Sequence, residues 1–144
     1  MTQQTPDTET LNAFNKGIID EFRANGGRVT GQFANANLLV LTTTGAKSGQ
    51  SRVSPLAYFR IDDKLIIIGS FAGAPVNPAW VNNLRANPQA RVEIGTDAFD
   101  ATARELPSAE RDELFPKIAA VAPGFAEYQS KTSRVIPLFE LQRV

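Results

Sequence analysis

Six short apolar stretches, separated by turn-forming residues, determine the kind of fold that this chain of 144 residues can adopt. Each stretch has the length of a strand, and Asp62-Asp63 and Gly95-Thr96-Asp97 are typical of turns between antiparallel strands. We expect strands over residues 38–44, 52–61, 64–70, 91–94, 99–106 and 135–141. Pro55 has no backbone N–H, so we expect it at an edge or a bulge. About six mostly antiparallel strands predict a sheet that closes into a barrel.

Helical periodicity predicts three to four helices outside this sheet, which makes the fold α+β. They cover residues 8–25, 78–86 (with Asn77 as its cap), 108–121 and 125–131. The first has one apolar face, formed by Leu11, Phe14, Ile18 and Phe22. Its polar face mixes acidic and basic residues, which favours packing on the barrel over a membrane surface. We therefore expect a single domain over residues 1–144, with residues 1–27 forming an N-terminal helix packed on the barrel.

The composition excludes several kinds of chemistry. Cysteine and histidine are absent, so the chain has no thiol nucleophile, no Ser–His–Asp triad and no Cys/His zinc site, and we expect no metal. The remaining proton-handling groups are carboxylates, lysines and two tyrosines, Tyr58 and Tyr128. An enzyme made of these residues uses carboxylates alone or depends on a cofactor for the difficult step.

Charge and hydropathy limit the partners and the location. Lys+Arg and Asp+Glu number 15 each, so no basic excess points to nucleic acid. No apolar run is long enough to span a bilayer, and the polar N-terminus lacks the apolar region of a secretory signal. We expect a cytoplasmic protein without stable membrane insertion, and association with a membrane surface stays open.

The polar segment 42–55, between the first two expected strands, is the best candidate for a binding site. It holds two glycines, several hydroxyls and two cations, Lys47 and Arg52. Glycines let the backbone turn with its N–H groups inward, and the cations add positive charge, which suits an anionic group such as a phosphate. A solvated hairpin with ordinary surface cations is the alternative. A P-loop is disfavoured because the adjacent Gly-Lys pair is missing and a strand follows.

Four motifs in order resemble the deazaflavin-dependent nitroreductase family of actinobacteria. They are LTTTGAKSG (41–49), RVSPL (52–56), NPAWVNNLRANP (77–88) and, near the C-terminus, YQS (128–130) with RVIP (134–137). The resemblance runs from about residue 38 to the C-terminus. It implies a split β-barrel related to FMN-binding oxidoreductases and the cofactor F420, an 8-hydroxy-5-deazaflavin with a phosphodiester and a glutamate tail. It also implies hydride transfer from the reduced cofactor to a nitroaromatic, a quinone, or a conjugated enone or lactone such as a coumarin-type toxin.

The same resemblance implies where the cofactor binds. Lys47 and Arg52, with Ser48 and Gly49 beside them, would hold the acidic tail. Ala46 stands where family members usually have arginine, so this loop has one cation fewer, and the effect on tail binding is open. The other residues assigned to the cofactor are Pro55, Leu56, Ser70, Ala72, Gly73, Trp80 and Asn83. Structural alternatives remain for three places: Ser70 as a strand-end cap, Ala72-Gly73 as a flexible turn, and Trp80 as a core anchor.

On the acceptor side, Phe125 and Tyr128 are three residues apart in the last expected helix, so both can face a pocket mouth. Tyr128 is a candidate to hydrogen-bond an acceptor oxygen and to donate a proton, and Ser70 is the second candidate catalytic residue. Lys131 lies where relatives can carry bulkier aromatic groups. Relatives include monomers and dimers, so either state is expected. Two other functions stay open: an FMN-dependent oxidoreductase on the same barrel, and a non-enzymatic protein that binds a flavin or deazaflavin.

Overall fold

The computed structural model describes residues 8–29, 37–70 and 76–144, and for residues 8–14 the backbone alone. Its strands are β1 (Leu38–Thr44), β2 (Ser51–Ile61), β3 (Lys64–Ile68), β4 (Gln89–Ile94), β5 (Asp97–Glu105) and β6 (Leu138–Arg143). Its helices are α1 (Thr8–Ala24), α2 (Ala79–Ala86), α3 (Ser108–Val121) and α4 (Gly124–Ser130). Within these described ranges, each element that the sequence predicts is present.

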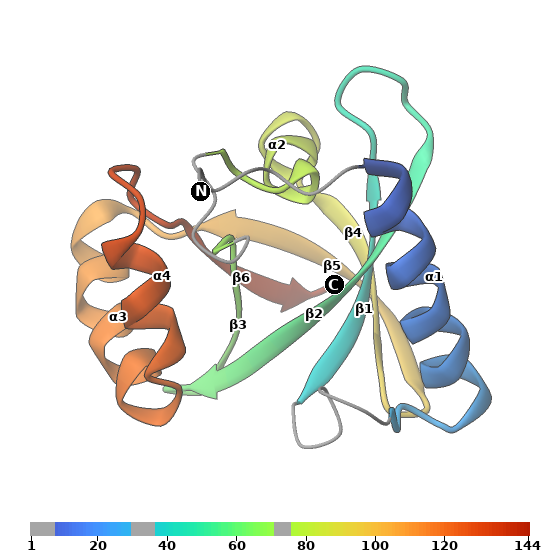
Figure 1. Cartoon of the computed structure of the whole chain (residues 1–144), viewed down its shortest axis with the longest axis horizontal. Coiled ribbons are helices and arrows are strands. Elements are labelled where there is room, and N and C mark those ends of the chain that lie inside the picture. The colour runs from blue at the N-terminus through green and yellow to red at the C-terminus, as the bar shows by residue number, and fades with distance from the viewer. Residues whose placement is uncertain (1–7, 30–36, 71–75) are drawn as a thin grey trace.

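The strands form one closed barrel in the order β1-β2-β3-β6-β5-β4 (Figure 1). All six neighbouring pairs are antiparallel. Three pairs are hairpins of consecutive strands, whereas β1 with β4 and β3 with β6 join strands that are far apart in the sequence. These long-range pairs close the sheet and confirm the predicted α+β barrel.

Pro55 lies within β2, opposite Val40 of β1. On the other side of β2, β3 pairs only with residues 58–61. The 51–57 part of β2 therefore has one partner strand among the described residues. A residue without an N–H is tolerated at such an edge, which confirms the expected edge position of Pro55.

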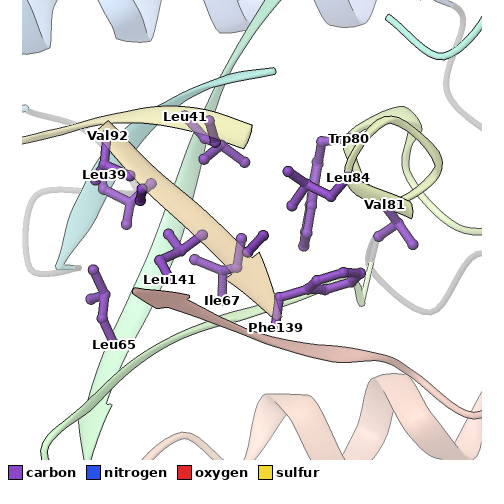
Figure 2. Close-up of a cluster of buried hydrophobic side chains, with 13 residues drawn as sticks. Leu39, Leu41, Leu65, Ile67, Trp80, Val81, Leu84, Val92, Phe139 and Leu141 are labelled. Atoms are coloured by element: carbon purple, nitrogen blue, oxygen red, sulfur yellow. The ribbon is translucent and has the colours of Figure 1, made fainter. Parts of the chain in front are cut away.

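Alternate side chains of the strands fill the barrel, and α2 adds three more at one end (Figure 2). The strands supply, among others, Leu39, Leu41, Leu65, Ile67, Val92, Phe139 and Leu141, and α2 supplies Trp80, Val81 and Leu84. Burial of each such side chain stabilises the fold by about 1.5–3 kcal/mol. Helix α2 is thus part of the core, and this packing fixes its position at the barrel end.

Helices cover two opposite outer faces of the barrel (Figure 1). Leu114, Phe115 and Ile118 of α3 pack with Ile66, Ile68 and Leu138 of the strands. On the other side, Ile19 and Phe22 of α1 pack with Leu38 and Val40 of β1, and Ile18 lies against this cluster. The contacts of Ile18 and Phe22 agree with the apolar face expected for the first helix. Leu11 and Phe14 fall where side chains are not described.

The end of α1 meets the β4–β5 turn with backbone against backbone. Gly26, Gly27 and Gly95 have φ values of 63°, 95° and 59°. A Cβ atom on Gly27 would lie 2.5 Å from the Cα of Gly95, which is far inside the contact distance of two carbon atoms. Glycine at position 27 is therefore required by this close approach as well as by the end of the helix.

The structure corrects two details of the predicted boundaries. The last strand begins at Leu138 rather than Val135, because Pro137 has no N–H and the Ile136 N–H donates to the Gln129 side chain at 3.0 Å. Asn77 does not cap α2. The N-cap is Pro78, with no side-chain cap bond, and the Asn77 side-chain oxygen accepts a hydrogen bond from Arg134 at 2.8 Å instead.

Candidate functional site

The β1–β2 loop, residues 45–50, is held in shape by bonds within the protein. The Gly45 N–H donates to the Gln50 carbonyl at 2.8 Å, and the Gly49 N–H donates to the Gly45 carbonyl at 2.9 Å. The Gln50 N–H donates to Ser48 Oγ at 3.2 Å, and the Ala46 N–H donates to Asn83 Oδ1 at 2.9 Å. Four of the six N–H groups of the loop are thus occupied. The expectation that the loop N–H groups point into an anion cradle is wrong for these four.

Asn83 of α2 fastens this loop to the barrel. Its side chain is 6% exposed. Its Oδ1 accepts from Ala46 in the loop, and its Nδ2 donates to Thr43 Oγ1 of β1 at 3.1 Å. The two bonds use the amide oxygen and one amide hydrogen. The structure therefore places Asn83 beneath the loop as a residue that positions it, and not as a group directed at a ligand.

Lys47 and Arg52 provide positive charge at this end of the barrel, and both are exposed. The side chain of neither residue has a hydrogen bond or ion pair with another residue in the described ranges. Arg52 lies opposite Thr43 in the β1–β2 register, so the two residues share one face of the sheet. This end of the barrel therefore combines a loop of fixed backbone with two exposed cations that are available to an anion, Lys47 in the loop and Arg52 at the start of β2.

Pro55 and Leu56, which follow along β2, point to opposite faces of the sheet because side chains alternate along a strand. Leu56 packs on the core cluster inside the barrel. Val53 and Ala57, which share the other face with Pro55, pack on the α1 side. Only Leu56 lies on the same face as Arg52, so the two neighbours do not line one surface together.

Trp80 is a core residue. It is 5% exposed, and its ring lies edge-on to Phe139, with a centroid distance of 5.6 Å and an interplanar angle of 66° (Figure 2). This packing supports the core-anchor alternative for Trp80 over a wall of an open pocket.

Ser70 follows the end of β3 and is 9% exposed. Its carbonyl accepts a hydrogen bond from Arg134 Nη2 at 2.8 Å, whereas its hydroxyl has no partner among the described residues. The preceding Gly69 is confined, because a Cβ there would lie 2.8 Å from Val81 and 2.9 Å from Pro137. Ala72 and Gly73 lie outside the described residues.

The three predicted acceptor-side residues lie together on or next to α4. Phe125 and Tyr128 form an edge-to-face pair at 5.7 Å, and Phe59 of β2 forms another with Phe125, also at 5.7 Å. Lys131 Nζ lies 5.8 Å from the centre of the Tyr128 ring. The Tyr128 hydroxyl has no hydrogen bond to a described residue. Phe125, Tyr128 and Lys131 thus lie beside one another, and their role on the acceptor side stays a prediction.

Sequence reasoning assigned no role to Gln129 and Arg134, although both lie in the motifs that carry the resemblance. The Arg134 guanidinium donates to the carbonyls of Gly69 (3.1 Å) and Ser70 (2.8 Å) and to Asn77 Oδ1 (2.8 Å). The Gln129 amide donates to the Arg134 carbonyl at 2.8 Å and accepts from the Ile136 N–H. Burial lowers the pKa of the Arg134 guanidinium, and the group still carries its charge at neutral pH.

Arg111 of α3 completes this set of bonds. Its guanidinium donates to the Ile136 carbonyl at 3.0 Å and to Gln129 Oε1 at 2.7 Å. Two motifs that are separate in the sequence are therefore one structural unit, which joins α3, α4 and residues 134–136 to the end of β3. Arg134 and Gln129 lie four and nine residues before β6, and their places in the motifs that carry the resemblance were the signal that could have indicated this.

Two hollows on the described surface lie away from the candidate site. One of about 430 Å³ opens at the barrel end opposite the β1–β2 loop, between Arg60, Leu65, Phe99 and Arg143. A second of about 300 Å³ lies between the end of α1 and the β4–β5 turn. Neither is lined by a predicted site residue. Among the described residues, no group of three or more acidic, Cys or His side chains could hold a metal, and no helix is long and apolar enough to cross a bilayer.

A closed six-stranded antiparallel barrel with helices on two faces is the split-barrel fold of flavin and deazaflavin oxidoreductases. Three comparisons with known proteins narrow this class. The sequence profile of the F420H(2)-dependent quinone reductase family matches residues 16–142. An F420H(2)-dependent quinone reductase of Mycobacterium tuberculosis strain H37Rv is 35% identical over 128 residues, which cover 85% of each chain.

Solved structures agree with the sequence relatives. An F420-H2 dependent reductase, FDR-A, is 39% identical with a TM-score of 0.65, and the match covers 74% of this chain and 94% of that chain. A structure described as a domain-swapped dimer is 35% identical with a TM-score of 0.67, and covers 93% and 94% of the two chains. This chain belongs to the F420H(2)-dependent quinone reductase family. The predictions of an oxidoreductase, of a deazaflavin-dependent family and of F420 as its cofactor are confirmed at this level.

Proposed function

We propose that this protein binds reduced F420 at the β1–β2 loop and reduces a quinone by hydride transfer. The observation that carries the proposal is the pair Lys47 and Arg52, two cations without described partners, one on a loop whose backbone is already fixed and one at the start of the strand that follows it. In a chain of this family, the anion that such a loop suits is the acidic tail of F420. Quinones come first among the acceptors because the relatives are named for them, and nitroaromatics and conjugated enones or lactones are secondary candidates.

The residues present fit the cofactor in charge and in hydrogen bonding. Lys47 and Arg52 would hold the phosphodiester and carboxylates of the tail, and each charge-assisted hydrogen bond would contribute about 1.5–3 kcal/mol. The Ser70 hydroxyl, which has no described partner, is available to the polar edge of the ring. Leu56, on the face that it shares with Arg52, offers apolar contact. Asn83 acts through the loop that it fastens.

When bound, reduced F420 supplies the hydride. A quinone that accepts the hydride becomes a hydroquinone anion, and one proton then completes the hydroquinone. The Tyr128 hydroxyl is the proposed donor or hydrogen-bond partner for the acceptor oxygen, and water can restore its proton. Phe125 and Phe59 would hold the Tyr128 ring and shield the acceptor from water. No covalent or metal-bound step is needed.

We further propose a homodimer, supported by the relative described as a domain-swapped dimer. Sedimentation of the purified chain measures the state directly. A monomer across the micromolar range would leave the proposed chemistry intact and remove only the dimer.

The decisive experiment compares F420 and FMN as ligands in parallel fluorescence titrations and then follows quinone reduction with reduced F420. We expect saturable F420 binding, at least tenfold weaker FMN binding, and turnover of a soluble quinone such as menadione. Tight FMN binding with no response to F420 would favour the FMN enzyme. F420 binding without turnover of quinones, nitroaromatics or enones would favour a non-enzymatic carrier.

Tyr128→Phe tests the acceptor side separately. Loss of the hydroxyl should lower kcat for the quinone about 10- to 100-fold, since positioned proton transfer contributes in that range, and should leave the Kd for F420 within about twofold. Tyr58→Phe is the matched control, because it removes the chain's other tyrosine hydroxyl. Equal kinetics in the two variants would remove the proton-donor role from Tyr128.

A further inference from the structure

Arg134 lies where the proposed cofactor side and the proposed acceptor side of the site meet. Among its interactions, its guanidinium donates hydrogen bonds in two directions, to the Gly69 and Ser70 carbonyls at the end of β3 and to Asn77 ahead of α2. Two of these acceptors are backbone atoms, which hold their places in the fold. The planar fork of arginine can span such a set, whereas the single ammonium group of lysine cannot.

The same residue is tied to α4 through Gln129. The Gln129 amide donates to the Arg134 carbonyl and accepts from the Ile136 N–H and from Arg111, so it fixes the main chain that carries the guanidinium. Gln129 is also the neighbour of Tyr128 in α4. The position of α4 relative to Ser70 is therefore set by a continuous series of bonds through Gln129 and Arg134.

A second series of contacts leads from Arg134 to the loop. Asn77 directly precedes the N-cap of α2, and the same helix carries Asn83, which holds the Ala46 N–H and Thr43. Next to Arg134, the Gly69 N–H donates to the Pro137 carbonyl at 2.9 Å, and Gly69 has no room for a side chain against Val81. A shift of residues 134–137 would thus move both the end of β3 and α2.

We propose that Arg134 is a positioning residue for hydride transfer, which sets α4, with Tyr128, against Ser70 and the α2-supported loop. This assignment rests on the proposed function, and it adds a residue that touches neither reactant. Misplacement of a reacting group by about 1 Å can reduce a rate about 100-fold. Loss of the guanidinium fork should therefore affect turnover more than it affects folding.

The test compares Arg134→Lys with Arg104→Lys. Arg104 is the matched control because it is also part-buried and also bonds two groups, Glu110 and Glu140, away from the loop. The readouts are the Kd for oxidised F420, kcat and KM with menadione, and Tm by circular dichroism. We expect both variants to lose a few degrees of Tm. Only Arg134→Lys should lower kcat, about 10- to 100-fold, with a rise of about threefold to tenfold in Kd.

If Arg134→Lys does not fold, Asn77→Ala tests the same proposal. It removes the Asn77 side-chain oxygen, which accepts one of the Arg134 hydrogen bonds, and leaves the guanidinium in place. We expect about a threefold to tenfold loss of kcat for it. An active wild type with equal kcat in Arg134→Lys and Arg104→Lys, or an unchanged kcat in a folded Asn77→Ala, would overturn the positioning role alone. A wild type that neither binds F420 nor reduces menadione would overturn the proposed function, and the positioning role with it.

Discussion

The β1–β2 and β4–β5 hairpins of the barrel differ in whether their charged side chains form ion pairs. The β4–β5 hairpin carries six charged residues, and all six form ion pairs, with one another or with α1, α2, α3 and β6. The β1–β2 hairpin carries three cations, Lys47, Arg52 and Arg60, and no acidic residue. None of the three has an ion pair to a described residue, and Arg60 lies against the Tyr58 ring at 5.8 Å.

The paired charges of the β4–β5 hairpin are used within the fold, whereas the unpaired cations of the β1–β2 hairpin are available to a ligand. Exposed ion pairs contribute little to stability, about 0–1 kcal/mol each, but they leave no net field on their hairpin. The unpaired cations of the β1–β2 loop give a local positive potential in a chain whose formal net charge is zero. The net charge of zero for the whole chain therefore conceals this local positive charge, which points to an anionic ligand.

The largest effect is expected when the unpaired cations are removed. Lys47→Ala with Arg52→Ala should raise the Kd for F420 about 100-fold or more, because each lost charge-assisted bond costs about 1.5–3 kcal/mol. The wild-type Kd should also rise with salt, and that of the variant should not. Fluorescence titration measures both. Arg91→Ala with Arg143→Ala removes two paired cations and should change the Kd less than threefold. Equal Kd values in the two double variants would refute the loop assignment.

Loosening the loop while keeping its cations should have a smaller effect. Asn83→Ala removes the bonds to Ala46 and Thr43, which we expect to cost about 2 kcal/mol of stability. The Kd for F420 should rise about tenfold because the loop is no longer held in place. Urea unfolding and titration measure the two quantities. Asn82→Ala, at the exposed neighbour on α2, is the control. A normal Kd in a destabilised Asn83→Ala would show that loop fixation does not matter for binding.

Adding charge should sharpen the contrast between the hairpins. Ala46→Arg adds a cation to the loop, at the position where the family resemblance implies arginine, and should lower the Kd for F420 about fivefold, at low salt above all. The Ala46 N–H bond to Asn83 is a backbone bond, so the substitution leaves it in place. Ala46→Gln controls for side-chain length. Equal affinities of the arginine and glutamine variants would mean that the tail does not approach position 46.

The smallest effect concerns the paired hairpin and its pH dependence. Hydrogen bonding from Arg104 lowers the pKa of the Glu110 carboxyl below its ordinary 4.5. A carboxyl with a lowered folded-state pKa stabilises the protein above its unfolded-state pKa, and this contribution is lost as the pH falls toward the folded-state pKa. Glu110→Gln should therefore show a slightly smaller loss of Tm between about pH 5.5 and 3.5 than the wild type. Thermal melts across this range measure it, and a steeper loss in the variant would contradict the pairing.

The sequence predicted the fold well because its signals are local. Turn residues such as Asp62 and Asp63, which adopt φ values of 53° and 64°, define hairpins from the sequence alone, and hairpins imply antiparallel pairing. The site was predicted less well because contacts between residues that are distant in the sequence decide which of its side chains are available to a ligand. Trp80 and Asn83 share a motif with the expected ligand contacts, yet packing sends one into the core and uses the other to hold the loop. Arg134 had no visible role because its acceptors lie 57 to 65 residues away.

The contact of Gly27 with Gly95 restricts how this molecule can be altered. A methyl group added at Gly27 would clash with the main chain at Gly95. To relieve this clash, α1 would have to move away from the barrel, which would expose Leu38 and Val40 to water. The exposed positions Lys16, Gly17 and Asp20 of that helix can accept substitutions or labels, whereas Gly27, just beyond its last turn, cannot. The protein can therefore be attached to a support through the exposed side of α1, provided that the Gly27–Gly95 contact is left unchanged.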